Sequence, residues 1–169
     1  LNNFTGVNIT FPFKEKVIKY ADKISASVSN LKSANTLIFQ KNIIAYNTDY
    51  SGFIKSYHFH FKKKQPGKIL VIGAGGVGRA IIYALASLEV KELCFLDTNI
   101  PKGEGLLKEL KQQNVNCTLL KHTQLEGMIS SFDGIINCTP LGHYDFPGTS
   151  LGDFDIKNYQ WLYDVVYTP

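Results

Sequence analysis

A glycine-rich hexapeptide, Gly-Ala-Gly-Gly-Val-Gly at residues 73–78, constrains the fold of this chain more than any other feature. It follows the apolar run 68–72 and precedes a stretch with apolar residues at helical spacing. Between a buried strand and a helix, the pattern G-x-G-x-x-G is typical of a turn that binds the pyrophosphate of a dinucleotide. A glycine-rich turn that binds nothing is the alternative. The residues predicted to form the phosphate site are Gly73, Ala74, Gly75, Gly76 and Val77.

Strands and helices alternate regularly along the second part of the chain. After the strand 68–72 and the helix 77–88, strands are expected over 93–96, 117–120, 133–138 and 161–166, and helices over 103–113 and near 124–130. Strands separated by helices need right-handed crossovers, which make the strands parallel. The sequence therefore predicts an α/β fold with a Rossmann-like doubly wound parallel sheet over residues 62–169.

The first part of the chain has a different pattern, which ends at a run of three lysines. Strands are expected over 7–10, 34–39 and 43–47, and helices over 14–26 and 50–61. We interpret residues 1–61 as the C-terminal part of a smaller α/β domain that ends in a connecting helix. The chain begins at Leu1 rather than at a methionine, so we expect it to be a piece of a longer protein.

Asp97 ends the strand that follows the glycine-rich turn, at the spacing expected for a residue that contacts the cofactor. A carboxylate there accepts hydrogen bonds from ribose hydroxyls and repels a 2′-phosphate. No arginine follows, since Thr98 and Asn99 come next, although Lys102 could reach a phosphate. This favours NAD as the cofactor and leaves NADP possible. Alternatively, Asp97 only caps the following turn.

Two further segments carry candidate functional residues in the first part of the chain. Lys14 follows an apolar run and a proline, and Asp49 lies in Asn-Thr-Asp-Tyr-Ser-Gly (47–52) at a strand end. A lysine beside apolar side chains loses solvation and becomes usable for proton transfer. The alternatives are a solvated Lys14 on an edge strand and an Asp49 that only caps a helix.

A third segment, Asn-Cys-Thr-Pro-Leu-Gly (137–142), ends a strand of the predicted sheet. Doubly wound folds bind ligands at the carboxyl ends of their strands. We expect this loop to lie over a nicotinamide ring, which makes Cys138, Thr139 and Pro140 candidate cofactor-binding residues.

Composition argues against several other classes of protein. The net charge is +4, and Arg79 is the only arginine, so the concentrated basic and aromatic residues of a nucleic-acid site are missing. His58 and His60 lack a third ligand and do not share a face of the predicted helix, so no metal site is expected. We expect no membrane association, since the sequence has neither a long apolar run nor a signal-peptide pattern.

The three cysteines, Cys94, Cys117 and Cys138, stand singly in apolar, strand-like runs without metal-ligand spacing. An odd number of isolated cysteines fits reduced, buried thiols rather than a disulfide framework. This pattern favours a cytoplasmic location.

Six motifs in this order resemble the shikimate dehydrogenase family and span the chain. They are Gly-x-Asn-x-Thr-x-Pro-x-Lys (6–14), Ala-Asn-Thr (34–36), Asn-Thr-Asp-x-x-Gly-Phe (47–53), Gly-Ala-Gly-Gly (73–76), Asn-x-Thr-Pro-x-Gly (137–142) and Asp-x-x-Tyr-x-Pro (164–169). Within the family, Gly-Gly-Val-Gly, Leu-Asp-Thr and Pro-Gly-Thr (147–149) look more like the NAD-using quinate/shikimate dehydrogenases.

The resemblance implies a role for individual residues. Lys14 and Asp49 would be the catalytic pair beside the hydroxyl that is oxidised. Thr10, Asn35 and Tyr167 would bind the substrate, and Val165 would join the cofactor site. Residues 1–61 would then belong to the substrate-binding domain and residues 62–169 to the NAD(P)-binding domain.

The implied reaction is reversible hydride transfer between NAD(P) and the ring hydroxyl of shikimate or quinate, with NAD preferred. A biosynthetic NADPH-dependent shikimate dehydrogenase is the alternative, and a non-catalytic dinucleotide-binding protein is a third. The partner is therefore expected to be a small-molecule substrate.

The chain also departs from the family pattern. Lys32, Ser33 and Ala34 stand where Gly-Ala-Val is usual, and His143 stands where a methionine is common. The family's N-terminal Ser-x-Ser segment and C-terminal helix are absent from these residues. We therefore expect the piece alone to be poorly active.

Overall fold

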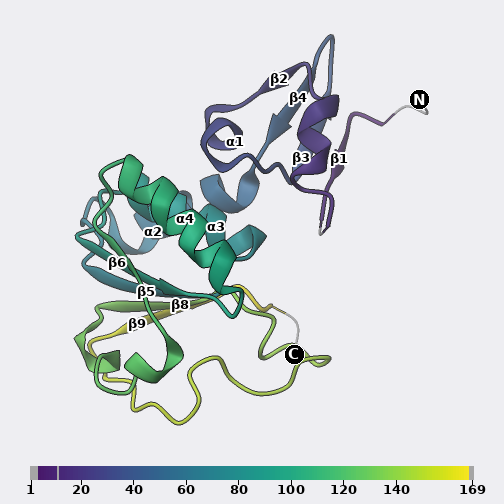
Figure 1. Cartoon of the computed structure of the whole chain (residues 1–169). Coiled ribbons are helices and arrows are strands. Elements are labelled where there is room, and N and C mark those ends of the chain that lie inside the picture. Colours follow the sequence, from purple (N-terminus) through teal and green to yellow (C-terminus); the bar gives the residue numbers. More distant parts are fainter. Residues whose placement is uncertain (1–3, 11, 168–169) are drawn as a thin grey trace. The chain divides into compact units, whose positions relative to one another are not determined.

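The computed structural model of the chain describes residues 4–10 and 12–167 and divides into two compact units (Figure 1). The first unit is Leu1–Lys63 and the second is Lys64–Pro169. Each unit has its own sheet and its own cluster of buried apolar residues.

The second unit is built on a parallel sheet of five strands in the order β7-β6-β5-β8-β9. The strands are β5 (Lys68–Ile72), β6 (Glu92–Leu96), β7 (Cys117–Leu119), β8 (Gly134–Asn137) and β9 (Trp161–Asp164). All four neighbouring pairs are parallel, which confirms the predicted doubly wound sheet. The strand order reverses between β5 and β8, so ligands are expected at the carboxyl ends of these two strands.

Helices cover one face of this sheet, and shorter segments cover the other. Helix α3 (Gly76–Ser87) and helix α4 (Ile100–Gln112) lie side by side on one face (Figure 1). On the other face, Leu70 and Ile72 share an apolar cluster with Leu125 and Phe132. The helix predicted near 124–130 is wrong: this part forms two 3₁₀ turns, η2 (His122–Gln124) and η3 (Ile129–Ser131).

The first unit contains a four-stranded mixed sheet in the order β1-β3-β4-β2. Its elements are β1 (Gly6–Asn8), η1 (Lys16–Tyr20), β2 (Lys23–Ile24), α1 (Ala26–Leu31), β3 (Thr36–Phe39), β4 (Ile43–Tyr46) and α2 (Thr48–Phe61). Strand β3 is antiparallel to both β1 and β4, whereas β2 is parallel to β4. Its buried apolar cluster is Val17, Val28, Ala34, Leu37 and Ala45.

The prediction of a helix over 14–26 is wrong, because part of its second half pairs with the sheet instead. Residues 16–20 form the single 3₁₀ segment η1, and Lys23 and Ile24 then pair with β4. The side chain of Asp22 accepts a hydrogen bond of 2.7 Å from the Ile43 amide, which anchors the chain at this sheet edge. Tertiary pairing therefore outweighs the helical spacing of the apolar residues.

Lys32 ends helix α1 in the left-handed conformation, with φ 50° and ψ 36°. A residue with a β-carbon is disfavoured there, and glycine is the usual choice. Lys32 therefore makes this turn at a conformational cost that a glycine would not have. The neighbouring Ser33 and Ala34 are buried, and among the described residues no partner is found for the Ser33 hydroxyl.

Gly134 provides a test of packing in the second sheet. A β-carbon at Gly134 would overlap the ring of Trp161, its register partner on β9. We expect Gly134→Ala to lower the free energy of unfolding by about 1–3 kcal/mol, because the added methyl group would displace the Trp161 ring from its place beside the buried strand β8. Urea unfolding of the chain measures this difference.

Gly105→Ala in helix α4 is the matched control. A β-carbon at Gly105 meets no atom within 4 Å. This substitution should raise stability by roughly 0.5–1 kcal/mol, because alanine is the better helix former. Equal and small effects of the two substitutions would contradict the packing described here.

Candidate active site

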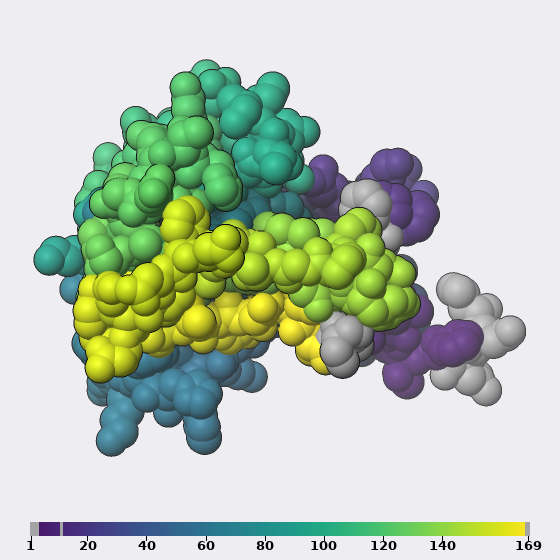
Figure 2. Space-filling model, turned by 90° about the horizontal axis from the view of Figure 1, so that it is seen from below, coloured from purple at the N-terminus to yellow at the C-terminus, as the bar shows by residue number. Residues whose placement is uncertain are grey.

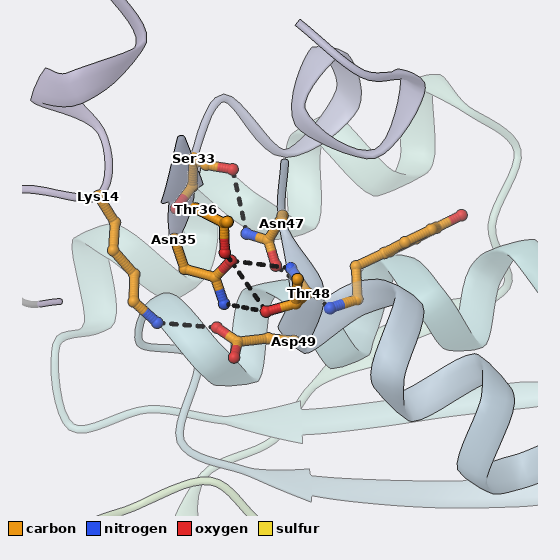
Figure 3. Close-up of polar contacts among 8 residues, drawn as sticks. Lys14, Ser33, Asn35, Thr36, Asn47, Thr48 and Asp49 are labelled. Carbon is orange, nitrogen blue, oxygen red and sulfur yellow. Dashed lines mark hydrogen bonds and ion pairs between the residues drawn. The ribbon is translucent and has the colours of Figure 1, made fainter. Parts of the chain in front are cut away.

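Lys14 and Asp49, which are 35 positions apart, form an ion pair in the first unit (Figure 3). The Lys14 Nζ donates to Asp49 Oδ2 at 2.7 Å, and the two side chains are only 17% and 24% exposed. The main chain of Lys14 is held as well, since its carbonyl accepts a hydrogen bond from the Ala34 amide at 2.8 Å. The structure thus brings the predicted catalytic pair together in a partly buried position.

Helix α2 presents Asp49 without using its carboxylate as a cap. Asn47 is the N-cap, and its side-chain oxygen accepts from the Tyr50 amide at 3.2 Å. The alternative that Asp49 caps the helix is therefore wrong. Asp49 lies in the first turn, and its carboxylate oxygen Oδ2 meets the lysine.

Asn35, a predicted substrate-binding residue, also supports the start of α2. Its Oδ1 accepts from the Thr48 amide at 2.8 Å and from the Thr36 hydroxyl at 3.0 Å, and its Nδ2 donates to the Thr48 hydroxyl at 2.9 Å (Figure 3). Asn35 is 9% exposed. These bonds tie the beginning of β3 to the helix that carries Asp49.

Asn47 is a supporting residue that sequence reasoning did not single out. It is 1% exposed, and its Nδ2 donates to the Ser33 carbonyl at 3.0 Å while its Oδ1 caps α2. The helix begins at Thr48, two residues before the start expected from the sequence, and this earlier start makes Asn47 the residue directly before it. Asparagine is a usual N-cap, so the residue type was a signal but its position relative to the expected helix was not.

The two other predicted substrate-binding residues are exposed. Thr10 follows β1, and its carbonyl accepts from the Phe13 amide at 2.9 Å. Tyr167 is 93% exposed and belongs to the second unit. Their roles in substrate binding stay predictions.

The glycine-rich turn in the second unit has the geometry of a phosphate cradle. Gly73 has φ +91°, which favours glycine, and a β-carbon on Gly78 would overlap the Gly73 carbonyl oxygen. The β-position of Gly75 faces open space, and no side chain among the described residues caps the start of α3. Helices α2 and α4, by contrast, are capped by asparagine side chains. The residues present therefore fit the pyrophosphate of a dinucleotide.

Asp97 both caps a turn and braces this cradle. Its Oδ1 accepts from the Asn99 amide at 2.7 Å, and its Oδ2 accepts from the Ala74 amide at 2.7 Å. The capping role that the sequence left as an alternative is therefore present. Each carboxylate oxygen can accept more than one hydrogen bond, so the contacts leave Asp97 able to bind ribose hydroxyls.

A cavity of about 450 Å³ lies in the second unit beside the cradle. Six predicted cofactor-binding residues line it: Gly73, Gly75, Asp97, Cys138, Thr139 and Pro140. The structure adds His122, Thr149 and Ser150, which sequence reasoning did not assign to the cofactor.

The other predicted cofactor residues do not line this cavity. Gly76 and Val77 form the first turn of α3, and the buried Ala74 lies in the turn before it. The Val165 amide donates to the Asn137 carbonyl at 3.1 Å, directly after β9. The segment that follows β8, yellow-green to yellow in Figure 2, forms a band of the surface of this unit.

The structure offers neither a metal centre nor a membrane span in the parts it describes. No group of three or more His, Cys, Asp or Glu side chains there could hold a metal ion. No helix there is long and apolar enough to cross a membrane.

Arg79 of α3 pairs with Glu109 of α4 at 2.5 Å and therefore links helix α3 to helix α4.

Comparison with known proteins gives matches over both units. A sequence model described as the shikimate dehydrogenase substrate binding domain matches residues 1–37, and one described as shikimate / quinate 5-dehydrogenase matches residues 56–148. The chain belongs to the shikimate/quinate dehydrogenase family. The second match alone covers more than half of the chain and includes the glycine-rich turn.

Named relatives of this family use either nicotinamide cofactor. A shikimate dehydrogenase (NADP(+)) of Clostridium botulinum is 34% identical over 99% of this chain, and a quinate/shikimate dehydrogenase (NAD(+)) of Corynebacterium glutamicum is 30% identical over 98%. The chain spans 63% and 60% of the lengths of these two relatives.

Solved structures of family members have the same fold. Quinate dehydrogenase from Corynebacterium glutamicum in complex with NAD gives a TM-score of 0.85 at 30% identity, over 98% of this chain and 60% of that one. Shikimate 5-dehydrogenase from Listeria monocytogenes in complex with shikimate and NAD gives 0.83 at 26% identity, over 98% and 61%.

Thiol reactivity tests the placement of the cofactor cavity. Burial raises the pKa of Cys94 to about 11 and also raises the pKa of Cys117, whereas Cys138 is half-buried and lines the cavity. At pH 8 we expect a disulfide reagent to label Cys138 first, because Cys138 borders the cavity. Cys94 and Cys117 should react slowly, because their raised pKa values keep them protonated and only thiolates attack. Mass spectrometry of the labelled chain identifies the residue.

Saturating NADH should slow the labelling of Cys138 and leave the two buried thiols unchanged. Cys138→Ser is the control, and it should remove the fast phase. Labelling of Cys138 that is insensitive to NADH would place the cofactor elsewhere.

Proposed function

We propose that the protein to which this chain belongs carries out reversible hydride transfer between NAD and the ring hydroxyl of shikimate or quinate. The observation that carries the proposal is the partly buried Lys14–Asp49 ion pair in a chain that also has an uncapped, glycine-lined dinucleotide turn. A module that only binds a dinucleotide does not need a proton-transfer pair.

The chain's own residues would handle the proton of the reacting hydroxyl. When the alcohol is oxidised, the O–H proton passes to the Lys14–Asp49 pair, and in the reverse direction the pair returns a proton to the carbonyl oxygen. Asp49 holds the amine of Lys14 in place, while Asn35 and Asn47 fix the start of the helix that carries Asp49. The bound nicotinamide supplies or accepts the hydride.

Lys14 and Asp49 are both needed for this role, and either could carry the proton in the slow step. Their exposure of 17% and 24% leaves room for a ligand hydroxyl while limiting access of water. We propose that Thr10, Asn35 and Tyr167 bind the polar groups of the substrate. These contacts would hold the substrate hydroxyl next to Lys14 and Asp49, and this positioning would provide most of the rate enhancement.

The carboxylate of Asp97 supports NAD as the preferred cofactor. It lies on the wall of the cavity and would repel a 2′-phosphate. The NAD-dependent relative and the NAD complex of quinate dehydrogenase agree with this preference. The NADP-dependent relatives favour the second candidate, a biosynthetic NADPH-dependent shikimate dehydrogenase.

The cellular location, the roles of the two domains and the partner are also part of the proposal. Cys94, Cys117 and Cys138 form no disulfide with one another, which fits a reducing compartment, and we propose a cytoplasmic location. We also propose that the domains are residues 1–61 for the substrate and residues 62–169 for the cofactor. The partner is a small molecule, shikimate or quinate.

The first test offers shikimate and quinate, each with NAD and with NADP, to the complete gene product that carries these residues. We expect turnover with NAD to exceed turnover with NADP, because Asp97 repels the 2′-phosphate. NAD(P)H absorbance measures the rates. The control is Asp97→Ser, which should reduce the discrimination between the cofactors.

A clear preference of the unmodified protein for NADP would favour the biosynthetic candidate. Absence of turnover with all four combinations would contradict the proposed reaction.

A second test separates a dehydrogenase from a binding protein. We expect Lys14→Met to lower kcat by about 10²–10⁴-fold, because positioned proton transfer contributes that much. NADH binding, measured by fluorescence, should be unchanged, since the glycine-rich turn lies in the other unit.

Lys16→Met is the matched control, because Lys16 is exposed at the start of η1. It should retain full activity. Retained turnover in Lys14→Met would show that this lysine is not part of the reaction.

A further inference from the structure

Asn137 is the last residue of β8, and its side chain holds the loop that faces the glycine-rich turn. It is 8% exposed. Its Nδ2 donates to the Leu141 carbonyl and to Asp164 Oδ1, both at 3.0 Å. Its Oδ1 accepts from the amide of Thr139 at 3.0 Å and from the hydroxyl of Thr139 at 2.7 Å.

These four bonds use the whole hydrogen-bonding capacity of the Asn137 amide, which has two N–H donors and two acceptor positions. The side chain therefore has no polar capacity left for a ligand. Any effect of Asn137 on a bound cofactor must act through the residues that it holds in place.

The loop that Asn137 holds forms a wall of the cofactor cavity. Cys138, Thr139, Pro140 and Leu141 all line this cavity. The loop also touches the glycine-rich turn: the β-position of Gly73 lies 3.0 Å from the Cys138 carbonyl oxygen. This place is the point where the strand order reverses, between β5 and β8.

Asp164 completes the arrangement from the neighbouring strand. It is the register partner of Asn137 and the last residue of β9. Its Oδ1 accepts from the Val166 amide at 2.9 Å as well as from Asn137, and the Val165 amide donates to the Asn137 carbonyl at 3.1 Å. One carboxylate oxygen thus ties residues 164–166 to the loop that follows β8.

We propose that Asn137 and Asp164 are positioning residues that fix the nicotinamide-binding wall of the cofactor site. The proposal rests on the proposed function, since it assumes that a dinucleotide occupies the cavity. The two side chains have different hydrogen-bonding roles. Asn137 must supply two donors, which an aspartate lacks, whereas an asparagine can replace the acceptor of Asp164.

The test compares the binding of NADH with that of ADP-ribose, which lacks the nicotinamide ring, by the full chain. We expect Asn137→Asp and Asp164→Ala to weaken NADH binding by about tenfold or more, as for the loss of a hydrogen bond to a charged group. Asp164→Asn should stay within about threefold, because it keeps the acceptor. ADP-ribose affinity should change by less than about twofold in all three, since ADP-ribose lacks the ring that the proposal places against this wall.

Asp133→Ala is the matched control. Asp133 lies just before β8, and its carboxylate accepts from the Lys68 amide at 2.7 Å, at the opposite end of the same strands. It should lower the melting temperature without changing the ratio of NADH affinity to ADP-ribose affinity. Calorimetry measures the affinity of each variant for both ligands, and thermal unfolding measures its stability.

Three outcomes would overturn the proposal. An equal loss of affinity for both ligands would mean that the substitutions damage the fold rather than the wall, and unchanged NADH binding in Asn137→Asp and Asp164→Ala would mean that the pair is dispensable. A failure of the unmodified chain to bind either ligand would overturn the proposed function together with this inference, and is distinguishable because it appears before any substitution.

Discussion

The close approach of helix α3 to strand β5 is the constraint on which the cofactor site depends. The carbonyl of Gly73 occupies the space that a side chain on Gly78 would need. This contact directs the uncapped start of α3 toward the carboxyl edge of the sheet, where Asp97 and the loop after β8 also lie. The glycine-rich turn, Asp97 and the loop after β8 meet there because parallel strands bring their carboxyl ends to one edge of the sheet.

Asparagine side chains hold the other functional segments in place. In the first unit, Asn35 and Asn47 fasten the start of α2 to the chain before β3, and so present Asp49 to Lys14. In the second unit, Asn137 fastens the loop after β8 to Asp164. An asparagine can donate and accept at once, which suits a buried site where main-chain donors and acceptors must both be satisfied.

Much of the second unit was predictable from the sequence, and less of the first. The glycine turn, the strands from 68 onward and the parallel sheet rest on local patterns that few alternatives share. Residues 14–26 show the limit of this reasoning: apolar residues at helical spacing predicted a helix, but pairing of Lys23 and Ile24 with β4 decided the outcome. The prediction of a helix near 124–130 is wrong for a similar reason, because the apolar residues of this region pack against the sheet without forming a regular helix.

The sequence by itself determined the fold of the cofactor unit and the identities of Lys14, Asp49 and Asp97 as candidate residues, because their motifs lie in short continuous segments. Only the tertiary structure decided how these residues are used. It showed that Asn47 rather than Asp49 caps α2, that Asp97 braces the glycine turn, and that Asn137 meets Asp164 across two strands. The physical reason is that each of these choices depends on hydrogen bonds between segments far apart in the chain, which local spacing does not encode.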